Sequence, residues 1–436
     1  MRFVHPLPTC FMTYKHYCAV GFAASLLVPT LCLSADWPQY RGLLGDGIST
    51  ENLSIKPFPP SGPKVLWKVP LRNGFSSFAV SGNRAYTQVN RDLDGSAREV
   101  VVALDTANGQ EVWFAAVGSG KYDGGGDSGA EDNKGGDGPR STPTVNGDKV
   151  YVFNQHLLLY CLDASTGKTN WTKDLVKEYA GRNIGWKSAA SVVTDGDLAF
   201  VSGGGPGESL LALNKTSGQV VWKAHDEKTT HATPVVATIQ GVRQVIFFMQ
   251  SGLVSVKAQD GQLLWKFPFR YSVSTASSPV VDGDVVYCSA GYGVGGGACK
   301  ISRTGDHLTA TELYKISGDK KIANHWSTPV VLNGYLYGMF SFKDFGKGPL
   351  KCVELATGQI KWEQPGFGPG NVVAVNGQIV ALSDKGVLVV VKATPEAYTE
   401  ITRAQVITGK CWSTPALSDG RLYVRSTKEG ACIDLR

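Results

Sequence analysis

Two glycine-rich stretches have the residue types of nucleotide-binding loops. Residues 167–169 read GKT, the end of a phosphate-binding loop, but such a loop has a second glycine five positions earlier, where Leu162 stands. Residues 291–297 read GYGVGGG and satisfy the GxGxxG pattern of dinucleotide sites. The residues after that pattern favour two more strands, whereas a dinucleotide site requires a helix there. We therefore interpret both stretches as structural turns.

Candidate metal ligands are few. His231 and His325 are of the ligand type that zinc prefers, but no third ligand accompanies them in the sequence. The segment 118–138 contains carboxylates, the ligands that calcium prefers, yet their spacing does not match a DxDxDG loop. We expect an exposed loop there and no metal site. These carboxylates are Asp123, Asp127, Glu131, Asp132 and Asp137.

An eleven-residue element that recurs five times indicates the framework on which any site must rest. Each copy has a small residue first, glycine seventh and tryptophan eleventh, and four of the five read GQ where the fifth reads GK. The interval from glycine to tryptophan is therefore what recurs, as in a structural repeat. The copies are ALDTANGQEVW (103–113), CLDASTGKTNW (161–171), ALNKTSGQVVW (212–222), SVKAQDGQLLW (255–265) and CVELATGQIKW (352–362).

Eight predicted hairpins alternate with this element. Each hairpin has two β-rich runs separated by Asn, Asp or Gly, and the clearest begin with Ser-Thr-Pro or Ser-Ser-Pro. Together with the glycine-to-tryptophan element they give four strands per unit of about 43 to 50 residues, the spacing of a propeller blade. The clearest hairpins are STPTVNGDKVYVF (141–153), SSPVVDGDVVYCS (277–289), STPVVLNGYLYGM (327–339) and STPALSDGRLYVR (413–425).

The order of the repeats predicts how the ring closes. One tryptophan strand, KVLWKVP (64–70), precedes the first hairpin, and no such strand follows the final ACIDLR (431–436). We expect the N-terminal strand to complete the last blade, which leaves the ring without a free sheet edge. The sequence therefore predicts an all-β, eight-bladed β-propeller of four-stranded antiparallel blades.

The repeated glycines and tryptophans have a structural explanation. A tight turn between outer strands favours positive φ, which glycine adopts at no steric cost. The tryptophan four residues later can then pack between blades, a burial worth roughly 4 to 6 kcal/mol before entropy. We assign this docking role to Gly109, Gly167, Gly218, Gly261 and Gly358, and to Trp67, Trp113, Trp171, Trp222, Trp265 and Trp362.

Basic and aromatic residues occur where the chain enters the innermost predicted strands. Propellers usually bind ligands or peptides at the axial mouth onto which these positions face. We predict a binding rim there, and the alternative that each residue only packs its own loop stays open. The rim residues are Arg140, Trp186, Lys187, His231, His325, Trp326 and Trp412.

The N-terminus has the pattern of an export signal. Basic residues precede the apolar run 18–33, and the run is shorter than the roughly 20 residues a membrane span prefers. We divide the chain into a signal peptide (1–34), a lead segment (35–63) and the propeller (64–436), and expect an exported protein of the periplasm or the extracellular space. The start codon, Met1 or Met12, and membrane anchoring stay open.

The net charge bears on the class of partner, and the cysteine positions bear on possible disulfides. Loss of residues 1–34 lowers the net charge from +6 to +4, because Arg2 and Lys15 leave and no acid does. Such a mild charge does not favour nucleic acid as a partner. Three of the remaining cysteines, Cys161, Cys352 and Cys432, take the small-residue position of the repeat, whereas pairing of Cys288 with Cys299 stays open.

These repeats, together with ADWPQYRG (35–42), make the chain similar to the PQQ-like β-propeller repeat family, which includes quinoprotein alcohol dehydrogenases and outer-membrane assembly factors of the BamB type. The resemblance implies either a monomeric binding platform for envelope proteins or peptides, or a dehydrogenase that binds PQQ with calcium. The sequence has no adjacent cysteine pair and no CxxCH. We therefore predict a non-enzymatic scaffold protein without a cofactor, with the quinoprotein dehydrogenase as the alternative and a carbohydrate-binding propeller as the third.

Overall fold

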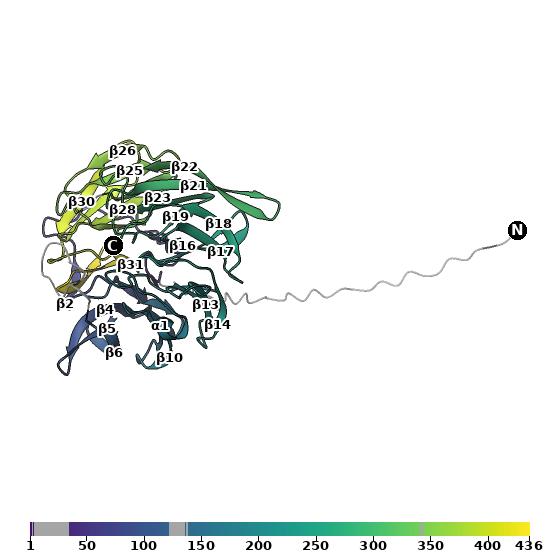
Figure 1. Ribbon diagram of the computed structural model, residues 1–436. Coiled ribbons are helices and arrows are strands. Elements are labelled where there is room, and N and C mark those ends of the chain that lie inside the picture. The colour runs from purple at the N-terminus through teal and green to yellow at the C-terminus, as the bar shows by residue number, and fades with distance from the viewer. Residues whose placement is uncertain (2, 4–34, 122–135, 137, 341–342) are drawn as a thin grey trace. The chain divides into compact units, whose positions relative to one another are not determined.

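Eight β-sheets arranged around one axis form the fold (Figure 1), in a computed structural model that describes residues 1, 3, 35–121, 136, 138–340 and 343–436. Seven sheets have four strands and one has five, and neighbouring strands within a blade are antiparallel. One short helix, α1 (Leu175–Glu178), is found among the described residues. The predicted eight-bladed propeller is confirmed.

The first strand of each blade lies nearest the axis, because the first strands of neighbouring blades contact one another. Blades one to four are β3(Ala79–Ser81) β4(Arg84–Leu93) β5(Ser96–Asp105) β6(Glu111–Ser119); β7(Thr144–Asn146) β8(Lys149–Phe153) β9(Leu158–Asp163) β10(Thr169–Asp174); β11(Val193–Asp195) β12(Leu198–Ser202) β13(Leu210–Asn214) β14(Val220–Ala224); and β15(Val235–Ile239) β16(Val242–Met249) β17(Gly252–Lys257) β18(Leu263–Pro268).

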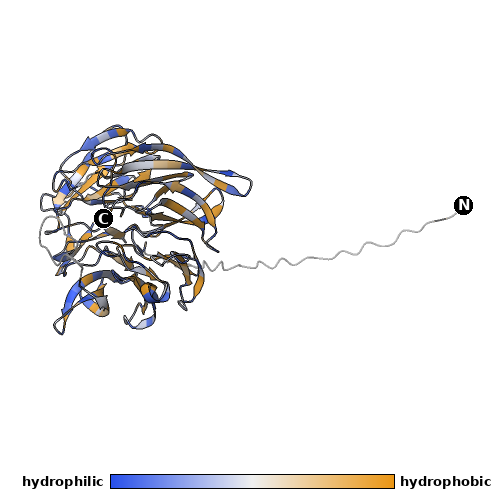
Figure 2. Ribbon diagram, viewed as in Figure 1, coloured by the Kyte–Doolittle hydropathy of each residue, from blue (hydrophilic) through white to orange (hydrophobic). Residues whose placement is uncertain are grey.

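Blades five to eight continue in the same order around the ring. They are β19(Val280–Asp282) β20(Val285–Ala290) β21(Gly295–Thr304) β22(His307–Ile316); β23(Val330–Leu332) β24(Tyr335–Met339) β25(Leu350–Glu354) β26(Ile360–Gln364); β27(Asn371–Val375) β28(Gln378–Leu382) β29(Val387–Lys392) β30(Glu400–Gln405), to which β1(Ile48–Ser49) adds in parallel; and β31(Ala416–Ser418) β32(Arg421–Arg425) β33(Glu429–Asp434) with β2(Val65–Pro70). Figure 2 shows the apolar residues along the strands and hydrophilic residues mostly in loops and hairpin ends.

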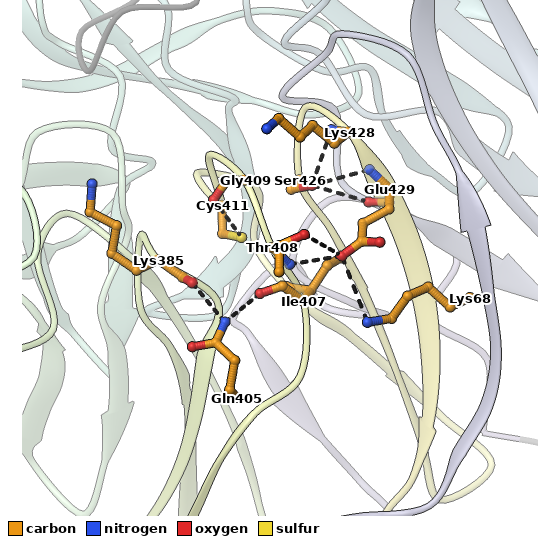
Figure 3. A network of polar contacts seen from close by, with 10 residues as sticks. All are labelled: Lys68, Lys385, Gln405, Ile407, Thr408, Gly409, Cys411, Ser426, Lys428 and Glu429. Carbon is orange, nitrogen blue, oxygen red and sulfur yellow. Dashed lines mark hydrogen bonds and ion pairs between the residues drawn. The ribbon is translucent and has the colours of Figure 1, made fainter.

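The ring closes as predicted, through β2. This strand pairs antiparallel with β33 and places Trp67 opposite Cys432. Beside the joint, Glu429 accepts hydrogen bonds from the amide and hydroxyl of Thr408 and lies 3.7 Å from Lys68 (Figure 3). The buried Arg425 of β32 reaches across to blade one and donates to the Gln88 carbonyl. The two ends of the chain are therefore joined both within blade eight and across its boundary with blade one.

A β-bulge accompanies every outer-strand pair. The tryptophan lies opposite the small residue of the repeat, as Trp113 lies opposite Ala103, and the register shifts beside that pair. A bulge re-aims a side chain, and five of the six repeat tryptophans donate to a backbone carbonyl of the next blade. The Trp113 Nε1 donates to the Ala164 carbonyl at 3.0 Å, and a Cβ added to Gly167 would meet the Trp113 ring at 2.5 Å. The glycines therefore provide room for an indole as well as positive φ.

Blades four and five depart from this pattern. Trp265 donates to Gln244 of its own blade, because the long β21–β22 hairpin brings no repeat glycine against it. Tyr314 takes the tryptophan position of blade five and packs on Gly358. The Trp265 ring still belongs to a buried cluster that includes Val286 and Cys288 of blade five, so only its indole N–H bonds within its own blade.

The lead segment crosses the axis of the ring. Trp37 pairs with Val80 of blade one, and the buried Arg41 donates to the Thr328 and Pro329 carbonyls of blade six. The Gly47 carbonyl then accepts from Ala374 of blade seven, where β1 begins. Because these partners lie on different sides of the axis, the segment occupies part of the central channel, an arrangement that the repeat pattern does not predict.

Hydroxyls of the Ser-Thr-Pro motifs join neighbouring blades. The Ser77 amide donates to Thr142 Oγ1, the Thr142 amide to Ser191 Oγ, and the Ser191 amide to Thr233 Oγ1, at 2.8 to 3.0 Å. The Ser278 amide donates to Thr328 in the same way. The recurrence of Ser and Thr before the innermost strands thus reflects the need to satisfy buried amides at the axis.

The remaining structural expectations have mixed outcomes. Residues 291–294 form the turn between β20 and β21, and residues 295–297 already belong to β21, so the predicted glycine-rich loop is shorter than its sequence pattern. Cys288 and Cys299 are both free, buried thiols, so the disulfide left open by the sequence is not formed. Most of the acidic segment 118–138 lies outside the described residues. Within the described part of the chain, we find no helix long and apolar enough to cross a membrane.

Candidate functional site

A pocket of about 130 Å³ lies on the axis, where the loops that precede the innermost strands converge. We call these loops the axial loops, and every blade contributes to the lining. Tyr40 of the lead segment is the lining residue that comes from outside the blades. The lining consists of Tyr40, Phe75, Ser77, Arg140, Trp186, Ala189, Ser191, His231, Thr233, Val273, Ser274, Ala276, His325, Trp326, Asn371, Trp412 and Thr414.

Six of the seven residues assigned to the rim meet in this pocket: Arg140, Trp186, His231, His325, Trp326 and Trp412. Lys187 does not line it, although it directly follows Trp186. Trp186 and Lys187 both have left-handed backbone conformations, with φ of 67° and 64°. Such angles are strained for residues other than glycine and often mark functional loops.

Aromatic rings form a continuous wall on one side of the pocket. Trp412 stacks on Phe75 with a centroid distance of 5.0 Å and on Phe345 at 5.8 Å. Its other neighbour is Trp326, at 4.3 Å. Trp326 in turn contacts His325 edge to face at 4.3 Å. Because each ring is held by the next, this wall is ordered before any ligand arrives.

Two buried histidines face the pocket from blades four and six. Burial, with Arg140 nearby, lowers the pKa of His231 to about 4, and burial, with Lys343 and His231 nearby, lowers the pKa of His325 to about 3. Both rings are therefore neutral at physiological pH. Although blades four and six are not neighbours in the ring, both histidines line the same pocket. No group of three metal-ligating side chains accompanies them in the described residues.

These histidines predict a loss of stability in acid. Their folded-state pKa values lie below the ordinary value of about 6.5, so the unfolded chain takes up protons first as the pH falls. The stabilisation is complete above about pH 6.5 and is lost progressively toward pH 4, by about 3 kcal/mol for His231. Urea unfolding of the mature protein at several pH values should show this slope. His231→Gln should flatten it, whereas substitution of the exposed His307 should leave it unchanged.

Cationic side chains surround the mouth of the pocket. The Lys410 ammonium lies 4.9 Å from the Trp412 ring centroid and 5.9 Å from that of Phe75. The Lys343 ammonium lies 5.6 Å from the Tyr292 ring. The Arg140 guanidinium donates to the Trp186 carbonyl, which fixes the charge beside the aromatic wall. Cations held against ring faces in this way keep their charge toward solvent.

The lining does not fit a calcium–quinone pair. Calcium takes six to eight oxygen ligands, most of them carboxylates, and the lining contains no carboxylate. The amide of Asn371 is already engaged, with its oxygen accepting from Thr414 and its nitrogen donating to the Trp412 carbonyl. Arg140 would also repel a divalent cation. We therefore assign no catalytic step to a bound quinone.

Several lining residues escaped the sequence analysis. Phe75 was not assigned because its hairpin is degenerate, although it precedes the Ser-Ser-Phe that replaces Ser-Thr-Pro in blade one. Tyr40 lies in the lead segment, outside the repeats, so the repeat pattern could not predict that it lines the pocket. Ser191 and Thr233 stand at positions of the Ser-Thr-Pro motif, which directly precedes the innermost strands. The motif therefore could have predicted that their hydroxyls lie at the axis.

The opposite mouth of the channel holds a second, larger cavity of about 380 Å³. Its lining combines the lead segment with the far ends of the inner strands, including Leu43 and Val145. Leu43 and Leu44 are exposed there, at 58% and 62%. The two linings thus differ: the first has four tryptophan and phenylalanine rings and no carboxylate, and the second combines aliphatic residues with the charged Asp195 and Arg243.

Comparison with known proteins relates the chain to one family. Residues 97–364 match the family described as outer membrane protein assembly factor BamB. A protein named outer membrane protein assembly factor BamB from Moranella endobia (strain PCIT) is 25% identical over 301 residues, covering 65% of this chain and 69% of the relative.

Two solved structures share the fold at low sequence identity. BamB from Moraxella catarrhalis has a TM-score of 0.58 and 16% identity, covering 85% of this chain and 96% of the other. The quinohemoprotein alcohol dehydrogenase ADHIIG from Pseudomonas putida HK5 has a TM-score of 0.63 and 13% identity, covering 92% of this chain and 80% of the other. Similarity at this level establishes that the propeller fold is shared. The activity has to be argued from the residues of the site.

Proposed function

This chain belongs to the family described as outer membrane protein assembly factor BamB, and on that basis we propose that it is an exported, non-enzymatic scaffold protein of the cell envelope. Its role is to bind envelope proteins or peptides, as a monomeric ring, at the face where the axial loops converge. The observation that carries the proposal is the lining of the axial pocket, in which ordered rings and hydrogen-bond donors occur without a carboxylate.

The chemistry of the lining supports binding over catalysis. The pocket offers no carboxylate base, and its histidines have pKa values of about 4 and 3, far below the pH at which a general base operates best. Its cysteine-free lining also lacks a nucleophilic thiol. A rigid closed ring with aromatic residues on its loops has the features of a binding surface.

Site-specific crosslinking tests the proposal. Gly185→Cys would place a thiol on the axial-loop face, at a position where an added Cβ meets nothing within 4 Å, and Leu44→Cys would place one at the opposite mouth. The six described cysteines are buried, so a photoreactive maleimide should label the new thiol selectively. After illumination in native envelope extract, we expect defined adducts from Gly185→Cys and few from Leu44→Cys.

The adducts must also depend on the pocket. Adding Trp186→Ala and Trp326→Ala should reduce them at least fivefold, whereas Phe114→Ala, an exposed aromatic on outer strand β6, should not. Equal adducts from both faces, or adducts that survive the tryptophan substitutions, would refute the proposed face. Dye-linked alcohol oxidation by the purified protein with PQQ and calcium would refute the non-enzymatic role.

A further inference from the structure

We propose that the axial pocket receives one aromatic side chain from an acidic segment of the partner protein. This inference rests on the proposed function and adds the chemistry by which the partner is recognised. Three features carry it: the aromatic wall, the buried Trp326 N–H that has no acceptor, and the cations placed near the pocket.

The shape of the pocket suits a single planar side chain. The lead segment crosses the channel beneath it through Trp37 and Arg41, and Tyr40 contributes to the lining, so a ligand enters from the axial-loop face. The wall of Trp326, Trp412 and Phe75 presents ring faces and edges at fixed angles. Aromatic pairs in such arrangements attract one another beyond the effect of area burial, which favours an aromatic over an aliphatic guest.

One buried donor in the pocket requires an acceptor from the ligand. Trp326 Nε1 has no hydrogen-bond partner among the described residues. The ring of His231, a residue only 7% exposed, instead interacts with the backbone of Lys187 and Gly185. Buried polar groups in native proteins are nearly always satisfied, and the lining contains no carboxylate to accept from the indole N–H. A ligand with a carbonyl or carboxylate oxygen would satisfy this donor.

The charges around the mouth favour an acidic ligand. Arg140 lines the pocket, Lys410 lies over the Trp412 ring, and Lys343 is close enough to lower the pKa of His325. Asp384 accepts from the Gly346 amide and Asp319 from the Gly293 amide, and neither carboxylate lines the pocket. A partner with carboxylates would therefore meet complementary charge, which increases the association rate and excludes basic competitors.

The position of the cations favours a chain segment over a free small molecule. Lys187, Lys343 and Lys410 do not line the pocket, although each lies beside a residue that does. A molecule confined to about 130 Å³ would not reach them. An extended peptide with one aromatic residue in the pocket and acidic residues on both sides reaches the pocket and the cations together.

Defined peptides test the inference directly. The probe is the capped peptide acetyl-Glu-Glu-Phe-Glu-Glu-amide, titrated calorimetrically into the mature protein. We expect binding to weaken at least tenfold when leucine replaces phenylalanine, and to be lost when lysine replaces every glutamate. Because the attraction is between charges, raising the salt from 50 to 500 mM should also weaken it.

Protein variants locate the site. Trp326→Ala should weaken binding of the probe about tenfold and Lys410→Gln about threefold. The matched controls Phe114→Ala and Lys361→Gln, an aromatic and a cation on the outer strands β6 and β26, should leave it unchanged. Trp326→Phe keeps an aromatic ring but loses the indole donor, so it should restore only part of the affinity lost in Trp326→Ala, which separates a loss of recognition from a loss of folding.

The possible failures are distinguishable from failure of the proposed function. If crosslinked partners depend on the pocket but the three peptides bind equally or not at all, the recognition chemistry is wrong and the scaffold role stands. If PQQ alone binds more tightly than the acidic phenylalanine peptide, and this binding depends on Trp326, the pocket is a small-molecule site and the inference is refuted.

Discussion

Gly167→Ala is expected to lower the free energy of unfolding by about 3 to 4 kcal/mol. The φ of Gly167 is 73°, where a Cβ costs about 1 to 2 kcal/mol. The added carbon would also meet Trp113 Cε3 at 2.5 Å, and overpacking of this kind typically costs a further 1 to 3 kcal/mol.

Gly147→Ala separates the two contributions. Gly147 has φ of 61° and an added Cβ there would meet nothing within 4 Å. We expect this control to cost only about 1 kcal/mol, the price of the backbone conformation. Equilibrium unfolding in urea of both variants gives the difference. Equal losses would show that Trp113 does not pack on Gly167, and the account of the repeated glycine would then be wrong.

Trp67→Ala is expected to cost about 4 kcal/mol and to loosen the closure of the ring. Trp67 is 6% exposed, lies 6.0 Å from the Tyr423 ring and donates to the Thr106 carbonyl of blade one at 2.9 Å. Removal of a buried tryptophan typically costs 3 to 5 kcal/mol. Because Trp67 lies on β2, the loss also weakens the strand that completes blade eight.

Trp222→Ala is the matched control for this variant. Trp222 is 8% exposed and donates to the Ala258 carbonyl at 2.9 Å, so the local loss is similar, but its strand connects blades that are consecutive in the chain. Hydrogen exchange should accelerate in β2 and β31–β33 for Trp67→Ala and in blades three and four for Trp222→Ala. If blade eight keeps full protection in Trp67→Ala, β2 is not what holds the ring closed.

The fold was predictable from particular residues. One tryptophan strand precedes the first hairpin in the sequence, which predicted that this strand completes the last blade. The pairing of Trp67 with Cys432 confirms that prediction. Trp265 shows the limit of the argument. Its repeat is intact, but the partner glycine depends on the next blade, where the long β21–β22 hairpin replaces the usual turn. A repeat position predicts the strand in which a residue lies, but it does not predict which residue of the next blade that side chain contacts.

The candidate site was less predictable than the fold. Arg140, Trp326 and Trp412 could be assigned to the axis because each stands at a fixed place before an innermost strand. That same rule did not reveal that Lys187 points outside the lining while Phe75, which has no Ser-Thr-Pro after it, belongs to the wall. Side-chain direction in these loops depends on backbone angles such as the left-handed φ of Trp186, which residue type does not specify.

By itself the sequence determined everything that recurs: the number of blades, their four strands, the positions of Gly and Trp, and the strand that closes the ring. Because the same contacts recur between most pairs of neighbouring blades, the same residue types recur at the same interval in the sequence. Only the tertiary structure decided what occupies the axis, where Tyr40 and Arg41 meet residues from blades far apart in the chain. Those contacts are made once, between segments without a shared period, and so depend on how all eight blades converge.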